Sequence, residues 1–180
     1  MAFLMPFLRP GLAALLALAG LLPSATAQAA STVDELEVKV AFIYNFVLFA
    51  EWPDEVGGTL RLCLYGVDRF GQALDVLQGR LVNTRVIELH RRPKGQSLKD
   101  CQVVFLADPL NNYGIRALDE LRGLPVLTVG DSPGAARLGV ALNIVETGGR
   151  MGFEVNLYSA RAGRIKISSK LLHLAREVIQ

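Results

Sequence analysis

The sequence predicts an α/β protein: one Rossmann-like three-layer sandwich with a mostly parallel sheet, an antiparallel edge and helices on both faces. Short apolar segments alternate with helical segments of about ten residues, which is the pattern of β-α-β units. Two apolar segments close to one another, residues 140–145 and 151–157, predict the antiparallel edge. The chain has 180 residues, 51% of them hydrophobic, and shows no internal repeat and no low-complexity linker, so we expect a single domain.

The first 29 residues have the composition of a secretory signal. Arg9 is their only charged residue, an apolar run covers residues 12–22, and Ala25, Ala27 and Ala29 fit an A-x-A cleavage pattern. The apolar run is shorter than the roughly 20 residues that a membrane-spanning helix needs. We therefore predict a signal peptide over residues 1–29 and an exported, near-neutral domain over residues 30–180 that does not span a membrane.

The exported chain is predicted to begin with a helix over residues 33–52. Asp34 is a suitable N-cap, and Pro53 marks the end. Residues 38–50 are apolar except for Lys39 and Asn45. A helix that is apolar on nearly all sides is expected to be buried on more than one of them.

The remaining elements follow in order, separated by turn-forming residues. Strands are predicted over residues 59–65, 86–89, 103–107 and 126–129, with helices over 69–78 and 114–121, a basic loop over 90–94 and a turn over 130–134. After the two strands of the antiparallel edge, Ile165 and Ile167 indicate a last extended piece. Ser168 or Ser169 is expected to cap a closing helix over residues 170–179.

Charge and cysteine content exclude several classes of protein. The formal net charge is only +2, from 19 basic and 17 acidic side chains, so nothing favours a nucleic-acid partner or a polybasic membrane anchor. Two cysteines are too few for a disulfide-rich scaffold. Cys63 and Cys101 both lie near predicted strands, and in an exported protein a disulfide between them is the simplest expectation; two buried thiols are the alternative.

Motifs for catalysis and cofactor binding are weak. Gly130-Asp131-Ser132 follows a strand, as in GDS-type serine hydrolases, but the base would have to be His90 or His173, and Pro133 makes a simple turn the better explanation. The chain has no glycine-rich dinucleotide motif, no P-loop and no recognised spacing of metal ligands. We therefore expect no catalytic residues, no cofactor and no metal.

Aromatic residues are concentrated in the first helix. Phe42, Phe46 and Phe49 share one helical face, at spacings i, i+4 and i+7, which is typical of a core stripe. Tyr44 and Leu48 lie on another face that is also apolar, so two interpretations remain open: a recognition helix for a partner, or plain burial. The candidate partner-binding residues are Phe42, Tyr44, Phe46, Leu48, Phe49 and Trp52.

Three segments carry a resemblance to a known family. They are residues 35–53 (ELEVKVAFIYNFVLFAEWP), 153–157 (FEVNL) and 167–175 (ISSKLLHLA), and together with the cysteine pair they resemble the YfiR-like periplasmic proteins. The resemblance implies a non-enzymatic periplasmic regulator, tending to form homodimers. Such a protein binds the periplasmic domain of an inner-membrane diguanylate cyclase and represses it, which keeps cyclic di-GMP and biofilm formation low.

The resemblance also implies a small-ligand pocket near the closing strands. Arg150, Glu154 and Lys166 are the candidates by position, and an exposed set of cross-strand ion pairs is the alternative. A second function stays open on these grounds, that of a periplasmic small-molecule sensor or accessory protein for another envelope receptor or histidine kinase. A GDS-type hydrolase is a marginal third.

Overall fold

The computed structural model describes the backbone of residues 27–180 and the side chains of residues 35–180. Most of the predicted signal peptide, residues 1–26, lies outside the described residues. None of the helices from residue 27 onwards combines the length and the apolar character needed to cross a membrane.

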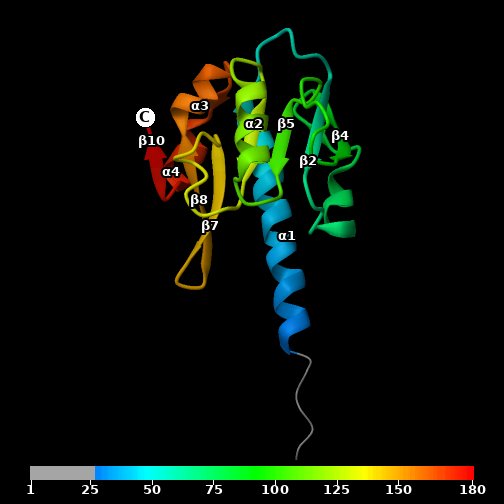
Figure 1. The fold of residues 1–180 in the computed structure, drawn as a ribbon, viewed down its shortest axis with the longest axis vertical. Coiled ribbons are helices and arrows are strands. Elements are labelled where there is room, and N and C mark those ends of the chain that lie inside the picture. Colours follow the sequence, from blue (N-terminus) through cyan, green and yellow to red (C-terminus); the bar gives the residue numbers. More distant parts are fainter. Residues whose placement is uncertain (1–26) are drawn as a thin grey trace, which may run out of the picture.

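The centre of the molecule is an eight-stranded sheet in the order β10-β8-β7-β6-β5-β2-β4-β3 (Figure 1). β4, β2, β5, β6 and β7 are parallel, β8 is antiparallel to β7, and β3 is antiparallel to β4. This confirms the mixed α/β fold with a mostly parallel sheet. The strands are β2 (Thr59–Tyr65), β3 (Leu81–Val82), β4 (Arg85–Arg92), β5 (Val103–Leu106), β6 (Leu127–Gly130), β7 (Leu142–Thr147), β8 (Arg150–Asn156) and β10 (Glu177–Ile179).

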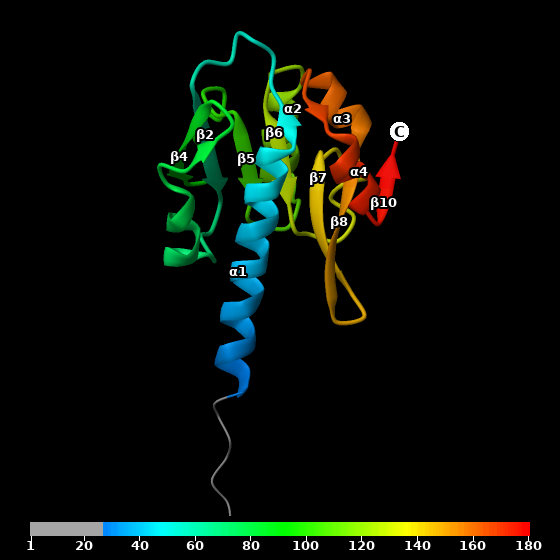
Figure 2. The ribbon, with the colours of Figure 1, turned by 180° about the vertical axis from the view of Figure 1, so that it is seen from behind.

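Helices cover both faces of this sheet. α1 (Ala27–Leu48) and the short 3-10 helix η1 (Gly71–Leu77) lie on one face, and α2 (Asn112–Leu121) lies on the other (Figures 1 and 2). The alternation of side chains along β2 separates two cores, because neighbouring residues of a strand point to opposite faces. Leu62 and Leu64 belong to the core under α1, whereas Cys63 and Tyr65 belong to the core under α2.

The first helix differs from its prediction at both ends. It begins at Ala27, so Asp34 lies inside it and is not the N-cap, and it ends at Leu48. Residues Ala50–Glu51 form the short strand β1, which pairs antiparallel with β9 (Lys166–Ile167). The backbone N–H of Ser168 also donates to the Phe49 carbonyl at 2.9 Å. Pro53 was expected to end the helix, but pairing with a strand more than a hundred residues away ends it earlier.

The prediction of a closing helix over residues 170–179 is wrong in its second half. α4 covers only Ser169–Leu174, with Ser168 as its N-cap: the hydroxyl oxygen accepts from the backbone N–H of Lys170 at 3.3 Å. Glu177–Ile179 then form β10, parallel to β8. The hydrogen bonds with β10 satisfy backbone groups along the edge of β8. A longer closing helix would have left those groups of β8 without a strand partner.

The structure differs from the sequence-based prediction in three further elements. α3 (Leu157–Ala162) was not predicted; it is capped by Asn156, whose side chain accepts from the backbone N–H of Ser159. The basic loop predicted over residues 90–94 is largely strand, since β4 continues to Arg92 in register with β2. The helix predicted over 69–78 is the shorter 3-10 helix η1.

Candidate functional site

The two cysteines form the predicted disulfide. Cys63 lies on β2 and Cys101 just before β5, with their Cα atoms 6.0 Å apart and their residues 0% and 1% exposed. The bond therefore joins two neighbouring strands on the α2 side of the sheet. Among the described residues no free cysteine remains, and the alternative of two buried thiols is excluded.

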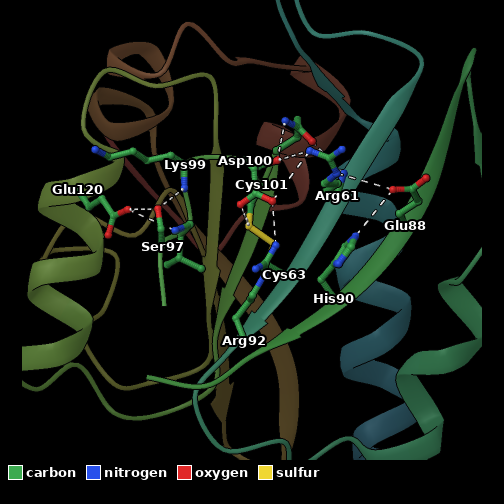
Figure 3. A network of polar contacts seen from close by, with 12 residues as sticks. Arg61, Cys63, Glu88, His90, Arg92, Ser97, Lys99, Asp100, Cys101 and Glu120 are labelled. Atoms are coloured by element: carbon green, nitrogen blue, oxygen red, sulfur yellow. Dashed lines mark hydrogen bonds and ion pairs between the residues drawn. A yellow bond between two sulfur atoms is a disulfide. The ribbon is translucent and has the colours of Figure 1, made fainter. Parts of the chain in front are cut away.

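Polar side chains surround this disulfide on its outer side (Figure 3). The Asp100 carboxylate accepts from Arg92 Nη2 at 2.8 Å, and Ser97 Oγ donates to Glu120 of α2 at 2.8 Å. Residues 93–101, which connect β4 to β5, are thus held to β4 and to α2 as well as to the disulfide. Each of these partly exposed contacts contributes little by itself, so the disulfide and the fully buried Leu98 are the stronger restraints on the connection.

The aromatic stripe of α1 belongs mainly to the core. Phe46 is fully buried, and the ring centroids of Phe42 and Phe46 lie 5.8 and 5.1 Å from that of Phe153 on β8, both edge to face. Trp52 is buried as well, and its indole N–H donates to the Gln102 carbonyl at 3.2 Å. Burial explains Phe46 and Trp52 without a partner, and the partly buried Phe42 packs against the same core.

Like Phe42, the other three candidate partner-binding residues are only partly buried. Leu48 and Phe49 pack against the same core as Phe46. Tyr44 packs against this core too, and it also lines a shallow groove of about 300 Å³ between α1 and η1. We call this the α1–η1 groove; its lining residues are Glu37, Val40, Ala41, Tyr44, Val76, Leu77 and Arg80.

The α1–η1 groove has apolar walls and a charged rim. Val76 of η1, which lines the groove with Tyr44, is 57% exposed. Arg80 is fixed at one side, where its Nε donates to the Val76 carbonyl at 3.2 Å, and Glu37 provides the opposite charge. Val76 and Arg80 were missed from the sequence because nothing in the local pattern shows that η1 packs beside α1.

A larger cavity of about 580 Å³ lies where β6 and β7 end, beside the N-terminal half of α1. Glu154 lines it, together with Lys39, Asp131 and Arg176. The other two candidate ligand residues are placed elsewhere: Arg150 is in the turn end of the β7–β8 hairpin, and Lys166 is in the separate β1–β9 sheet opposite Glu51. The structure therefore does not bring Arg150, Glu154 and Lys166 together, and ligand binding by them stays a prediction.

Lys39 joins α1 to the rim of this cavity. Its Nζ lies 2.7 Å from a carboxylate oxygen of Glu35 and 2.9 Å from one of Asp131, which follows β6. Burial opposes the charge, but the hydrogen bonds to Glu35 and Asp131 outweigh it, so the pKa of Lys39 is raised above its ordinary value. The ammonium group stays charged and holds the helix to the end of the sheet.

The basic residues after His90 do not offer a free anion site. Arg91 contacts Asp68 and Asp75, Arg92 contacts Asp100, and Lys94 lies 3.1 Å from Asp108. The hydrogen bonds from Arg91 to Asp68 and Asp75 raise the pKa of Arg91 further. Each of these three cations already has a carboxylate partner.

The residues that a hydrolase would need are far apart in the sheet. Ser132 follows β6, whereas His90 lies on β4, with β2 and β5 between the two strands, and His173 lies on α4. Among the described residues neither histidine is hydrogen-bonded to Ser132, so the structure adds no support to the GDS-type interpretation. In the part of the chain described here, no three His, Cys, Asp or Glu side chains are grouped so that they could hold a metal ion.

The fold and these surfaces define a disulfide-stabilised α/β domain with an open groove beside its first helix and a cavity at the end of its sheet. A family model described as YfiR/HmsC-like matches residues 36–176. The chain belongs to this YfiR/HmsC-like family. A comparison with curated proteins found no match.

Family membership confirms the resemblance noted in the sequence and gives a general role. It indicates a periplasmic regulator in cyclic di-GMP signalling that interacts with a periplasmic sensor domain. The buried disulfide fits the oxidising conditions of that compartment.

Proposed function

We propose that this protein is a non-enzymatic repressor that binds the periplasmic sensor domain of an inner-membrane diguanylate cyclase and lowers cyclic di-GMP and biofilm formation. The observation that carries the proposal is the α1–η1 groove, lined by the partly buried Tyr44 of α1 and the exposed Val76 of η1. The chain would reach the periplasm by removal of residues 1–29 and act there, expected as a homodimer.

The groove suits a protein partner better than a small ligand because it is shallow and apolar with charges only at its rim. A partly exposed aromatic side chain beside an aliphatic one gives association energy when a partner excludes water from both. Glu37 and Arg80 stand at the edge, where charges steer the encounter and fix its orientation. We expect an apolar anchor of the sensor domain, flanked by one basic and one acidic residue, to occupy the groove.

Repression then follows from a difference in affinity. If the sensor domain exchanges between an inactive and an active conformation, a protein that binds the inactive one more tightly moves the equilibrium towards it. Moving a population from 1:99 to 99:1 needs a difference of about 10⁴-fold in affinity between the two conformations. Weakening the groove contact by a few kcal/mol is therefore expected to release the cyclase.

Deletion of the gene is expected to raise cyclic di-GMP, and the wild-type gene should restore the low level. The variant Tyr44→Asp with Val76→Asp should fold, reach the periplasm and fail to restore it, with binding to the purified sensor domain weakened by about tenfold or more. Tyr113→Asp with Leu138→Asp is the matched control, since both residues are exposed on the α2 side of the sheet.

Two results would contradict the proposal. One is full repression by the folded groove variant; the other is an unchanged cyclic di-GMP level after deletion. Circular dichroism and the amount of protein in the periplasmic fraction separate loss of binding from loss of folding. Crosslinking in the native cell identifies the partner directly, and recovery of an unrelated kinase in place of a cyclase would favour the alternative role at another envelope receptor.

The cavity beside Lys39 supports a second candidate, a sensor of small molecules. Its volume of about 580 Å³ is within the range of ligand sites, and it lies at the carboxyl ends of parallel strands, where α/β proteins commonly bind ligands. A thermal-shift screen of periplasmic metabolites against wild type and Glu154→Gln tests it. A stabilising compound whose effect the variant loses would support this role, and no shift with any compound would count against it.

A further inference from the structure

The last part of the chain carries a charge asymmetry that the net charge of +2 conceals. Between Val155 and Arg176 lie five of the 19 Lys and Arg residues, and none of the 17 Asp and Glu. The rest of the chain is correspondingly acidic, with 14 basic against 17 acidic side chains. The near-neutral composition, which excluded a polybasic surface for the whole chain, does not exclude one confined to this segment.

The segment folds into α3, β9 and α4; the two helices lie at the β8–β10 end of the sheet (Figures 1 and 2), and β9 between them pairs with β1. Each helix buries one side in the core under α1, through Leu157 and Ala160 in α3 and through Leu171 in α4. The opposite sides face solvent. We call the exposed residues together the α3–α4 surface: Tyr158, Arg161, Lys166, Lys170, His173 and Leu174.

Two of the five cations are already engaged. Arg164 pairs with Glu55, and Arg176 Nη2 donates to the Arg150 carbonyl at 2.7 Å beside the cavity. Arg161, Lys166 and Lys170 form no ion pair with any described carboxylate, although Glu51 lies opposite Lys166 in the β1–β9 register. Three exposed cations are thus available to an anionic partner.

Two large side chains are exposed among these cations. Tyr158 is 75% exposed one turn before Arg161, and Leu174 is 71% exposed one turn after Lys170. They are the most exposed of the large hydrophobic residues in the described chain. Basic residues alternating with an exposed aromatic and an exposed aliphatic side chain are typical of segments that lie at a membrane interface, where cations meet phosphate groups and apolar tips enter the headgroup layer.

We propose that the α3–α4 surface binds anionic phospholipid headgroups, so that the protein makes a peripheral contact with a membrane. The inference goes beyond cyclase repression, since it concerns another surface and another partner. Charge complementarity carries it, and the exposed Tyr158 and Leu174 favour a lipid surface over an acidic protein. Three cations give a weak, reversible attraction that salt screens within about 10 Å.

The test uses the purified protein without its signal and two kinds of vesicle. The protein should co-sediment with vesicles of phosphatidylethanolamine that contain about a quarter of phosphatidylglycerol at about 50 mM salt. At about 500 mM salt it should stay in the supernatant. Vesicles of phosphatidylcholine alone should not bind it. Arg161→Glu with Lys170→Glu should lower the bound fraction by about tenfold or more.

A charge-matched control and a spectroscopic signal complete the experiment. Arg69→Glu with Lys99→Glu makes the same change in net charge at exposed positions on the β2 side and should bind as wild type does. In Tyr158→Trp the new indole should shift its emission to the blue on adding the anionic vesicles, while buried Trp52 already emits from an apolar site.

Several outcomes would overturn the proposal. They are absence of binding to the anionic vesicles, equal loss in both charge-reversal variants, or binding without any shift in the Tyr158→Trp emission. If vesicles are not bound but Arg161→Glu with Lys170→Glu weakens capture of the cyclase sensor domain, the surface meets an acidic protein and the membrane proposal is wrong. No cyclase is present in the vesicle assay, so its result is independent of the proposed repression.

Discussion

Asp68 organises the chain reversal that follows β2. Its carboxylate accepts from the backbone N–H groups of Phe70 and Gly71 at 2.8 and 3.0 Å and from Arg91 Nε at 2.6 Å. Gly71 has a φ of +52°, in the left-handed region that favours glycine. Burial opposes ionisation of Asp68, but the hydrogen bonds from Arg91 and the two backbone groups prevail and hold its pKa below the ordinary value.

Asp68→Asn is expected to cost about 1 kcal/mol of unfolding free energy at pH 7, because the amide keeps the turn but loses the charged bond to Arg91. A carboxylate with a lowered pKa in the folded state stabilises the fold above its unfolded pKa of about 4, and loses this effect as the pH falls through the folded value. Urea unfolding at neutral and acidic pH should show the variant approaching wild type below about pH 4.

Asp54→Asn is the control for this experiment, since Asp54 is exposed and its carboxylate has no hydrogen bond or ion pair to the described residues. It should unfold like wild type at every pH. A gap between wild type and Asp68→Asn that stays constant down to about pH 3 would show that the Arg91 contact is not what lowers the pKa.

The disulfide is the residue-scale feature that the sequence predicted correctly. Export and a single pair of cysteines were enough to expect it, whereas the Asp68–Arg91 contact could not be expected, because it depends on the register of β2 with β4. A disulfide can be expected from the number of cysteines and the oxidising compartment. An ion pair between exposed side chains can be expected only once the positions of both residues in the fold are known.

Replacing both Cys63 and Cys101 with alanine is expected to cost about 2–4 kcal/mol while leaving the sheet intact, since β2 and β5 remain hydrogen-bonded neighbours. Thermal unfolding of oxidised wild type, reduced wild type and the variant measures this. Reduction should produce a loss similar to that in the variant. Equal stability of all three samples would show that the bond is not a structural restraint.

At the scale of elements, α1 shows what a local pattern predicts and what it misses. Val40, Ile43, Phe46 and Val47 are buried at helical spacing, as the apolar stretch indicated. The start of the helix, its end at Leu48 and the strand β1 were not predicted. β10 was not predicted either: its residues were assigned to the closing helix over 170–179, but they pair with β8. Long-range pairing overrode local preference at both places.

Phe46 and Tyr44 provide a comparison within one helix. Phe46→Ala is expected to cost about 3–5 kcal/mol, because it opens a cavity beside Phe153 in a fully packed core. Tyr44→Ala should cost much less, since Tyr44 lines the open α1–η1 groove. Unfolding of the two variants in urea measures the difference. A cost for Tyr44→Ala equal to that for Phe46→Ala would place Tyr44 in the core and remove the basis of the groove proposal.

At the scale of the whole molecule, the fold class was predictable because the alternation of strands and helices recurs along the chain. The candidate site was predictable only in part. Tyr44 was singled out by its position on a second helical face, but Val76 and Arg80 needed the placement of η1 beside α1. The charge of the α3–α4 surface was hidden by averaging over 180 residues.

Removing residues 166–180 is expected to abolish the fixed tertiary structure. β1 would lose its partner, and the core under α1 would lose Leu171. The near-ultraviolet circular dichroism of Trp52 should collapse, with an unfolding transition that is weak or absent. Removal of Gln180 alone is the control, because this residue is exposed and lies outside β10. A cooperative transition in the shortened chain would contradict the expectation.

The pairing of β1 with β9 also sets the order in which the chain can fold. The first helix packs on Phe153, and the strand that follows it closes on Ile167, so neither contact exists until almost the entire polypeptide has emerged from the ribosome. Contacts between residues so distant in sequence form slowly. A growing chain of this kind cannot complete the core under α1 for most of its synthesis, and an incompletely folded polypeptide is the state that can be threaded across a membrane.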